Sequence, residues 1–181
     1  GPSFDAQPLP NRLLALPEAD RPAPNGAYVA YYEGSFAGSL PDFATRTPQA
    51  TGVAGRLDTT FAERRENYAL RYRATLRVPE TATYTLTVDS DGPSRVLLDG
   101  DAVIREQSGT RSVTRRLTRG AYPLVVEYAH DTGTGDLRVS WASDAVPTTA
   151  LPFTALSLNR VPHDYCVSTV DANGFPSVRR C

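Results

Sequence analysis

Apolar and polar side chains alternate with a period of two along much of the chain. The clearest stretch covers residues 68–78, whose apolar positions are Tyr68, Leu70, Tyr72, Ala74, Leu76 and Val78. Because successive side chains of a strand point to opposite faces of a sheet, this pattern predicts a strand with one buried face. Residues 84–88 repeat the alternation after the turn Pro79-Glu80-Thr81, and we expect these two strands to form a hairpin.

Shorter strands are predicted on either side of this pair, at residues 28–32, 95–98, 102–105, 111–117, 122–128, 137–141 and near 154–159. Asp99-Gly100 is typical of a two-residue hairpin turn, and the arginine-rich stretch 111–117 suits a sheet edge. Residues 33–67 are rich in Gly, Pro and Thr and indicate a long surface loop. Many short strands without a helical period favour an all-β fold, an antiparallel β-sandwich.

Proline marks the two ends of the chain. Residues 4–26 contain Pro8, Pro10, Pro17, Pro22 and Pro24, which predicts an extended arm because proline breaks helices and central strands. Residues 1–3, Gly-Pro-Ser, resemble the remnant of a cleaved tag. The expected organisation is therefore a remnant at 1–3, an N-terminal arm at 4–26, a domain at 27–142 and a C-terminal arm at 143–181.

Composition excludes several partners. The chain has 181 residues, of which 19 are basic and 20 acidic, giving a net charge of −1. This balance argues against a basic surface for nucleic acid or anionic membranes. No apolar run approaches the length of about 18 residues that a membrane helix needs, so we expect no membrane insertion by this segment.

Both cysteines, Cys166 and Cys181, lie in the C-terminal arm. The spacing contains no zinc-binding pattern, because His163 and Cys166 lack two further ligands. A Cys166–Cys181 disulfide is expected, which would require an oxidising compartment. The alternative is that each cysteine pairs with sequence beyond residue 181.

The chain contains none of the common catalytic motifs. His130 and Asp131 are neighbours in a Gly-rich loop, but nothing in the sequence places a nucleophile beside them. We therefore expect a domain that is not an enzyme. The aromatic residues of the predicted strands are assigned to the core: Tyr31, Tyr32, Tyr72, Tyr84 and Trp141.

Several separated motifs resemble the PA14 domain family. They are the opening Tyr31-Tyr32-Glu33-Gly34-Ser35-Phe36, the stretch Val78-Pro79-Glu80-Thr81 with Tyr84, the segment Ser90-Asp91-Gly92 continuing to Asp99-Gly100, the pair Gly120 and Tyr122, and the closing Leu137-Arg138-Val139-Ser140-Trp141. The resemblance covers residues 27–142. It implies a β-sandwich of the kind found in adhesins, toxins and accessory modules of glycosidases, and usually without catalytic activity.

The resemblance also raises the question of calcium. Some PA14 domains are calcium-dependent lectins in which two adjacent aspartates of one segment hold Ca²⁺. Here Asp91 takes the first position, but Gly92 takes the second, so the pair is broken. Asp131, in the loop where lectin members contribute a ligand, is the other candidate metal residue. The candidate ligand-binding loops contain Asp89, Ser90, Asp91, His130, Asp131 and Thr132; the alternative is that residues 90–93 form only a turn.

These observations predict a non-catalytic, extracellular recognition module of a bacterial cell-surface or secreted protein. Its partner would be a protein, including a second copy of itself, in cell–cell recognition or adhesion. The alternatives are a carbohydrate-binding, lectin-like domain, with Ca²⁺ or without it, and an accessory domain of a glycosidase. A domain followed by cysteines is also similar to myxobacterial outer-membrane-exchange receptors of the TraA kind, which would attach it to the outer membrane.

Overall fold

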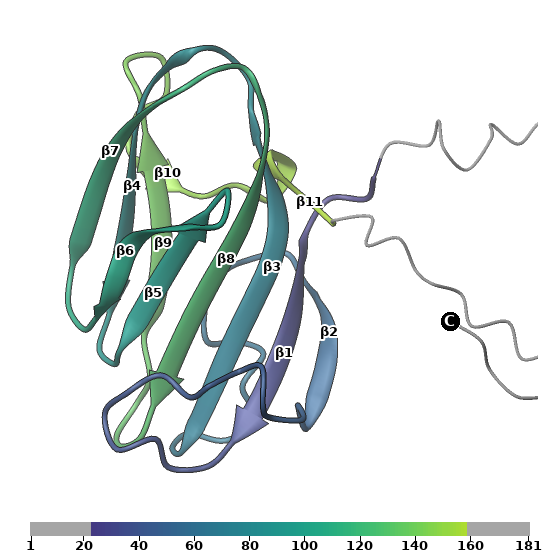
Figure 1. The fold of residues 1–181 in the computed structure, drawn as a ribbon, viewed down its shortest axis with the longest axis vertical. Coiled ribbons are helices and arrows are strands. Elements are labelled where there is room, and N and C mark those ends of the chain that lie inside the picture. Colours follow the sequence, from purple (N-terminus) through teal and green to yellow (C-terminus); the bar gives the residue numbers. More distant parts are fainter. Residues whose placement is uncertain (1–22, 159–181) are drawn as a thin grey trace, which may run out of the picture.

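The computed structural model describes residues 23–158 and shows two antiparallel sheets packed face to face (Figure 1). The all-β sandwich predicted from the alternation is confirmed. Within residues 23–158, no helix is long and apolar enough to cross a membrane. Most of the two arms, including Cys166 and Cys181, lies outside the described residues, so the disulfide stays a prediction.

The larger sheet has the strand order β2 (Ala50–Ala54), β1 (Ala27–Glu33), β3 (Tyr68–Val78), β8 (Gly120–His130), β5 (Ser94–Leu98) and β6 (Asp101–Gln107), with β11 (Leu156–Ser157) paired to β3. The smaller sheet has the order β10 (Thr149–Ala150), β9 (Leu137–Ala142), β4 (Ala82–Ser90) and β7 (Arg111–Leu117). A single 3₁₀ turn, Phe153–Ala155, connects β10 to β11.

The predicted hairpin between residues 68–78 and 84–88 is wrong. Strand β3 pairs with β1 and β8, whereas β4 pairs with β7 and β9 in the other sheet. Residues 79–81 therefore connect the two sheets. The apolar faces of β3 and β4 are buried against each other's sheet, because a sandwich core is formed by the inner faces of both.

One further difference and one agreement concern the segments outside the long strands. The predicted loop at 33–67 contains β2, which pairs with β1 through Tyr28–Val53 and Tyr31–Ala50. Its mixture of Gly, Thr and Ala gives no strong alternation, so only pairing with β1 makes it a strand. The predicted hairpin at Asp99-Gly100 is confirmed, and both residues have positive φ, 54° and 87°.

The core lies between the sheets. The alternating residues of β3 that were predicted to be buried are all 2% exposed or less: Tyr68, Leu70, Tyr72, Ala74, Leu76 and Val78. Trp141 stacks on Tyr84 with 5.4 Å between the ring centroids. Each such side chain contributes on the order of 2 kcal/mol by burial, so the packed faces of the two sheets are a main source of stability.

A second, smaller apolar cluster lies on the outer face of the larger sheet. The loop between β1 and β2 crosses this face (Figure 1) and packs Phe36 and Phe43 against Tyr32, Ala69 and Ala129. Phe43 also contacts the Arg71 guanidinium, 5.7 Å from its ring centroid. The β1–β2 loop is therefore a packed layer of the fold.

Candidate functional site

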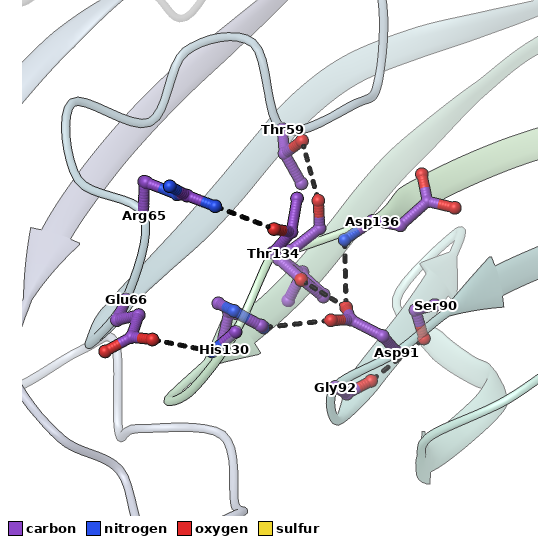
Figure 2. A network of polar contacts seen from close by, with 12 residues as sticks. Thr59, Arg65, Glu66, Ser90, Asp91, Gly92, His130, Thr134 and Asp136 are labelled. Carbon is purple, nitrogen blue, oxygen red and sulfur yellow. Dashed lines mark hydrogen bonds and ion pairs between the residues drawn. The ribbon is translucent and has the colours of Figure 1, made fainter.

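The loops at one end of the sandwich are held by Asp91, which follows β4 in the short connection to β5. Its Oδ1 accepts hydrogen bonds from the Tyr128 hydroxyl at 2.5 Å and the Asp136 backbone N–H at 3.0 Å. Its Oδ2 lies 3.1 Å from His130 Nδ1, which donates when that nitrogen carries the proton. Figure 2 shows His130 and the Asp136 backbone N–H approaching the Asp91 carboxylate. Asp91 thus joins the β4–β5 turn to β8 and the β8–β9 loop.

Aromatic rings enclose the donors of this network. His130 is 3% exposed, and its ring lies 5.5 Å from that of Tyr68 and 6.2 Å from that of Tyr128. Burial, and then the hydrogen bond to Asp91, raise the pKa of the Tyr128 hydroxyl well above its ordinary value, so it remains a donor. His130 Nε2 has no hydrogen-bond partner within residues 23–158.

The β8–β9 loop is also tied to the segment before β3. Thr59 Oγ1 donates to the Gly135 carbonyl at 3.4 Å, and Glu66 Oε1 accepts from the Gly133 N–H at 2.8 Å. Arg65 reaches Thr134 Oγ1 at 3.2 Å (Figure 2). The loop end is therefore a connected set of hydrogen bonds.

Asp131 serves another part of the structure. Its two carboxylate oxygens accept from the backbone N–H groups of Phe36 and Gly38, both at 2.7 Å. Burial alone would raise the pKa of Asp131, but these two hydrogen bonds, together with smaller contributions from Ser35 and His130, hold the pKa below its ordinary value. Asp131 thus anchors the start of the β1–β2 loop.

Asp131→Asn is expected to destabilise the domain by about 2 kcal/mol at neutral pH, because an amide oxygen and NH₂ cannot accept from two N–H donors. A carboxylate with a lowered pKa stabilises the fold above its ordinary pKa, and the contribution is lost as pH falls through the folded-state pKa. The difference between wild type and variant should therefore shrink below about pH 4. Denaturant unfolding of both proteins at neutral pH and below about pH 4 measures this difference in the free energy of unfolding. Asp144→Asn, at an exposed bend, is the control; a difference that persists in acid would contradict this role.

The remaining predicted loop residues are dispersed. Ser90 is 4% exposed and bonds Ser94 Oγ at 2.8 Å and the Gly92 carbonyl at 2.9 Å. Asp89 faces outward from β4 and accepts from Thr110 Oγ1 at 2.8 Å. Thr132 is exposed in the β8–β9 loop. The structure brings Asp91 and His130 together, whereas Asp89, Ser90 and Asp131 each serve a different place.

The residues present do not fit the calcium site that the PA14 resemblance implies. Protein donors already engage the carboxylates of Asp91 and Asp131, at separate positions. A Cβ added at Gly92 would lie 2.1 Å from the Ala129 carbonyl oxygen, so the second aspartate has no room. Residues 23–158 contain no cluster of three or more His, Cys, Asp or Glu side chains that could hold a metal.

A groove that sequence reasoning missed lies on the side of the sandwich. It has a volume of about 870 Å³ and runs between residues 55–60 and β9, with residues 150–153 at one side. Its walls combine Asp58, Asp89, Arg56 and Arg138 with the exposed ring of Phe153. These residues are far apart in sequence, and only the fold brings them together, so no local pattern could have indicated the groove.

Comparisons with known proteins agree with this architecture. The PA14 sugar-binding domain from RTX adhesin is 17% identical, with a TM-score of 0.62 over 75% of this chain and 99% of that one. The Epithelial Adhesin 6 A domain from Candida glabrata, in complex with Galβ1-3GlcNAc, is 12% identical, with a TM-score of 0.59 over 76% of this chain and 88% of that one. At these identities the likeness shows the shared fold.

An anti-sigma factor domain-containing protein from Clostridium clariflavum is 14% identical, with a TM-score of 0.63 over 76% of this chain; the chain spans about half, 49%, of that protein's length. No curated protein sequence matches this chain. The PA14 domain family model matches residues 24–155, from just before β1 to the 3₁₀ turn. The chain therefore belongs to the PA14 domain family.

Proposed function

We propose that this domain is a non-catalytic, extracellular recognition module that contacts a protein partner, a second copy of itself included, through the edge strand β2. The observation that carries the proposal is the composition of β2, Ala-Thr-Gly-Val-Ala, which has neither charge nor proline. Charged residues and proline normally protect an exposed strand edge, because an unpaired edge readily pairs with another chain. Strand β2 has neither kind of residue.

The other edges of the two sheets differ from β2. Strand β6 contains Asp101, Arg105 and Glu106, and β7 contains three arginines. Strand β10 is only two residues long. Of the outer strands in the described part of the chain, β2 alone is both uncharged and of ordinary length.

Val53 adds an apolar contact to this edge. Its side chain is 54% exposed, and Val53 and Phe153 are the only large hydrophobic residues so exposed within residues 23–158. Antiparallel pairing of β2 with β2 of a second copy around a two-fold axis would extend the larger sheet across the dimer, with the same surface used on both sides. Such a symmetric contact suits recognition of like by like.

Val53→Lys is expected to weaken self-association at least about tenfold, because a lysine on the edge would bring like charges together across the two-fold axis. Sedimentation equilibrium of the full chain over a range of concentrations measures the dimer. Thr114→Lys, on the arginine-rich edge strand β7, is the matched control and should leave association unchanged. A chain that stays monomeric throughout the range, or a dimer that tolerates Val53→Lys, would refute homotypic pairing through β2.

We extend this proposal to the parent protein as a bacterial cell-surface receptor for cell–cell recognition and adhesion, attached to the outer membrane through its other parts. Two features support it: the PA14 domain and the cysteines Cys166 and Cys181 that follow it in sequence. This order is similar to that of myxobacterial outer-membrane-exchange receptors of the TraA kind.

A second candidate function is carbohydrate binding. The groove beside β9 favours it, since it combines hydroxyl and charged groups with an exposed aromatic ring. Two structural relatives with the same fold are described as a sugar-binding domain and as an adhesin domain in complex with Galβ1-3GlcNAc.

A further inference from the structure

We propose that the groove between residues 55–60 and β9 binds a neutral saccharide without a metal ion. The inference rests on the carbohydrate-binding candidate above and assigns it to a groove that adjoins the loop end through Thr59 and Asp136 but is not lined by Asp91 or Asp131, the residues that the family resemblance indicates for calcium. The groove's volume of about 870 Å³ falls in the range of ligand sites, roughly 300–1,000 Å³.

The floor of the groove is apolar and firmly held. Leu57, Leu137 and Val139 line it and are 6% exposed or less. Leu151, also in the lining, donates its backbone N–H to the Val139 carbonyl at 2.9 Å, which joins the segment after β10 to β9. The β9 side of the groove is therefore held by the core and its strands, whereas residues 55–60 and 151–153 contribute irregular segments to the lining.

Hydrogen-bonding groups surround this floor. The lining contains the hydroxyl-bearing residues Thr87 on β4, Ser140 on β9 and Thr110, which directly precedes β7. Asp89 Oδ1 accepts from Thr110, which leaves Oδ2 of that exposed carboxylate available to a ligand hydroxyl. The Asp136 carboxylate extends away from the Asp91 network in Figure 2. Alternating donors and acceptors on a shallow surface suit a ligand rich in hydroxyl groups.

Phe153 supplies the complementary apolar contact. Its side chain is 46% exposed at the rim of the groove, and its ring lies beside Gly55, where an added Cβ would be 3.5 Å away. A pyranose ring has a C–H face that packs on an aromatic ring, while its hydroxyls project sideways to polar groups. An exposed aromatic ring beside carboxylate and guanidinium groups offers both contacts at once.

The charge of the groove favours a neutral ligand. Two arginines, Arg56 and Arg138, face three aspartates, Asp58, Asp89 and Asp136. Arg138 pairs with Asp136 at 3.4 Å, whereas Arg56 is exposed and has no partner among the described residues. A site without excess positive charge repels phosphates and sulfates more than it attracts them. The guanidinium groups instead offer planar sets of N–H donors to sugar oxygens.

Binding of the full chain to a printed array of neutral and sialylated oligosaccharides, with and without EDTA, tests the proposal. We expect binding to neutral oligosaccharides that is unchanged by EDTA. Phe153→Ser and Arg138→Gln should each weaken the apparent affinity at least about tenfold. Arg116→Gln, at an exposed arginine of β7 outside the groove, is the matched control for the charge change and should not alter binding.

Each failure has a distinct meaning. An array without any binding would overturn both the groove and the carbohydrate-binding candidate. Binding that survives Phe153→Ser and Arg138→Gln but is lost on Asp91→Asn would overturn the groove alone and return the saccharide to the loop end. Binding abolished by EDTA would overturn the metal-free site. The chain could also bind an extended peptide, lose that binding in Phe153→Ser and bind no oligosaccharide on the array. That result would identify the groove as a peptide site and refute saccharide binding.

Discussion

Glu127→Ala should destabilise the domain by about 3 kcal/mol and lower the melting temperature by about 10 °C. Glu127 lies on β8, on the outer face of the larger sheet, and is 2% exposed. Its Oε2 lies 2.6 Å from both Nε and a terminal nitrogen of Arg95, and its Oε1 lies 3.2 Å from Arg71 Nε. Removing the carboxylate leaves two guanidinium groups facing each other beneath the β1–β2 loop.

Two further variants separate charge from packing. Glu127→Gln preserves the shape of the side chain but places an amide between two cations, so it should lose most of the same stability. Glu63→Ala, which removes an exposed carboxylate, should change stability by less than about 0.5 kcal/mol. Denaturant unfolding of the three variants provides the measurement. If Glu127→Ala were as stable as Glu63→Ala, the ion pairs would contribute nothing net to the fold.

The sequence predicts the core better than the topology, for a physical reason. Alternation along β3 and β4 marks which side chains are buried, because each strand has one face toward the core whatever its neighbours. It does not specify which sheet a strand joins. Pro79-Glu80-Thr81 is therefore equally compatible with a hairpin and with the crossing between sheets that the structure shows.

The candidate site was only partly predictable for a related reason. The family resemblance indicates both the segment at Asp91 and the loop at His130, and the structure places His130 Nδ1 3.1 Å from Asp91 Oδ2. The direction of each carboxylate depends on backbone donors from distant segments, such as the Phe36 N–H that binds Asp131. The groove depends on Phe153, whose exposure reflects the path of the chain after β10 and leaves no mark in the local pattern.

Gly92→Asp, which restores the adjacent aspartate pair of the calcium-binding family members, should destabilise the domain by about 3 kcal/mol and should not create calcium binding. A Cβ at position 92 would lie 2.1 Å from the Ala129 carbonyl oxygen, which is backbone and cannot rotate away. Hydrogen bonds hold both Gly92 and Ala129 at this close contact. The Ala129 N–H donates to the Pro93 carbonyl at 3.0 Å, and the Gly92 carbonyl accepts from Ser90 Oγ at 2.9 Å. Relief would require β8 and the β4–β5 turn to separate.

The comparison with Gly120→Asp isolates this clash. A Cβ at Gly120 meets no atom closer than 3.8 Å, so the same side chain there should cost less than about 1 kcal/mol. Thermal unfolding of wild type and both variants, with millimolar Ca²⁺ and with EDTA, measures stability and metal binding together. A ligand that binds only the folded state raises the melting temperature, so calcium should leave all three unchanged. Stabilisation of Gly92→Asp by calcium would show that the turn can open to admit the ion, whereas stabilisation of the wild type would show that Asp91 exchanges Tyr128 and His130 for a metal.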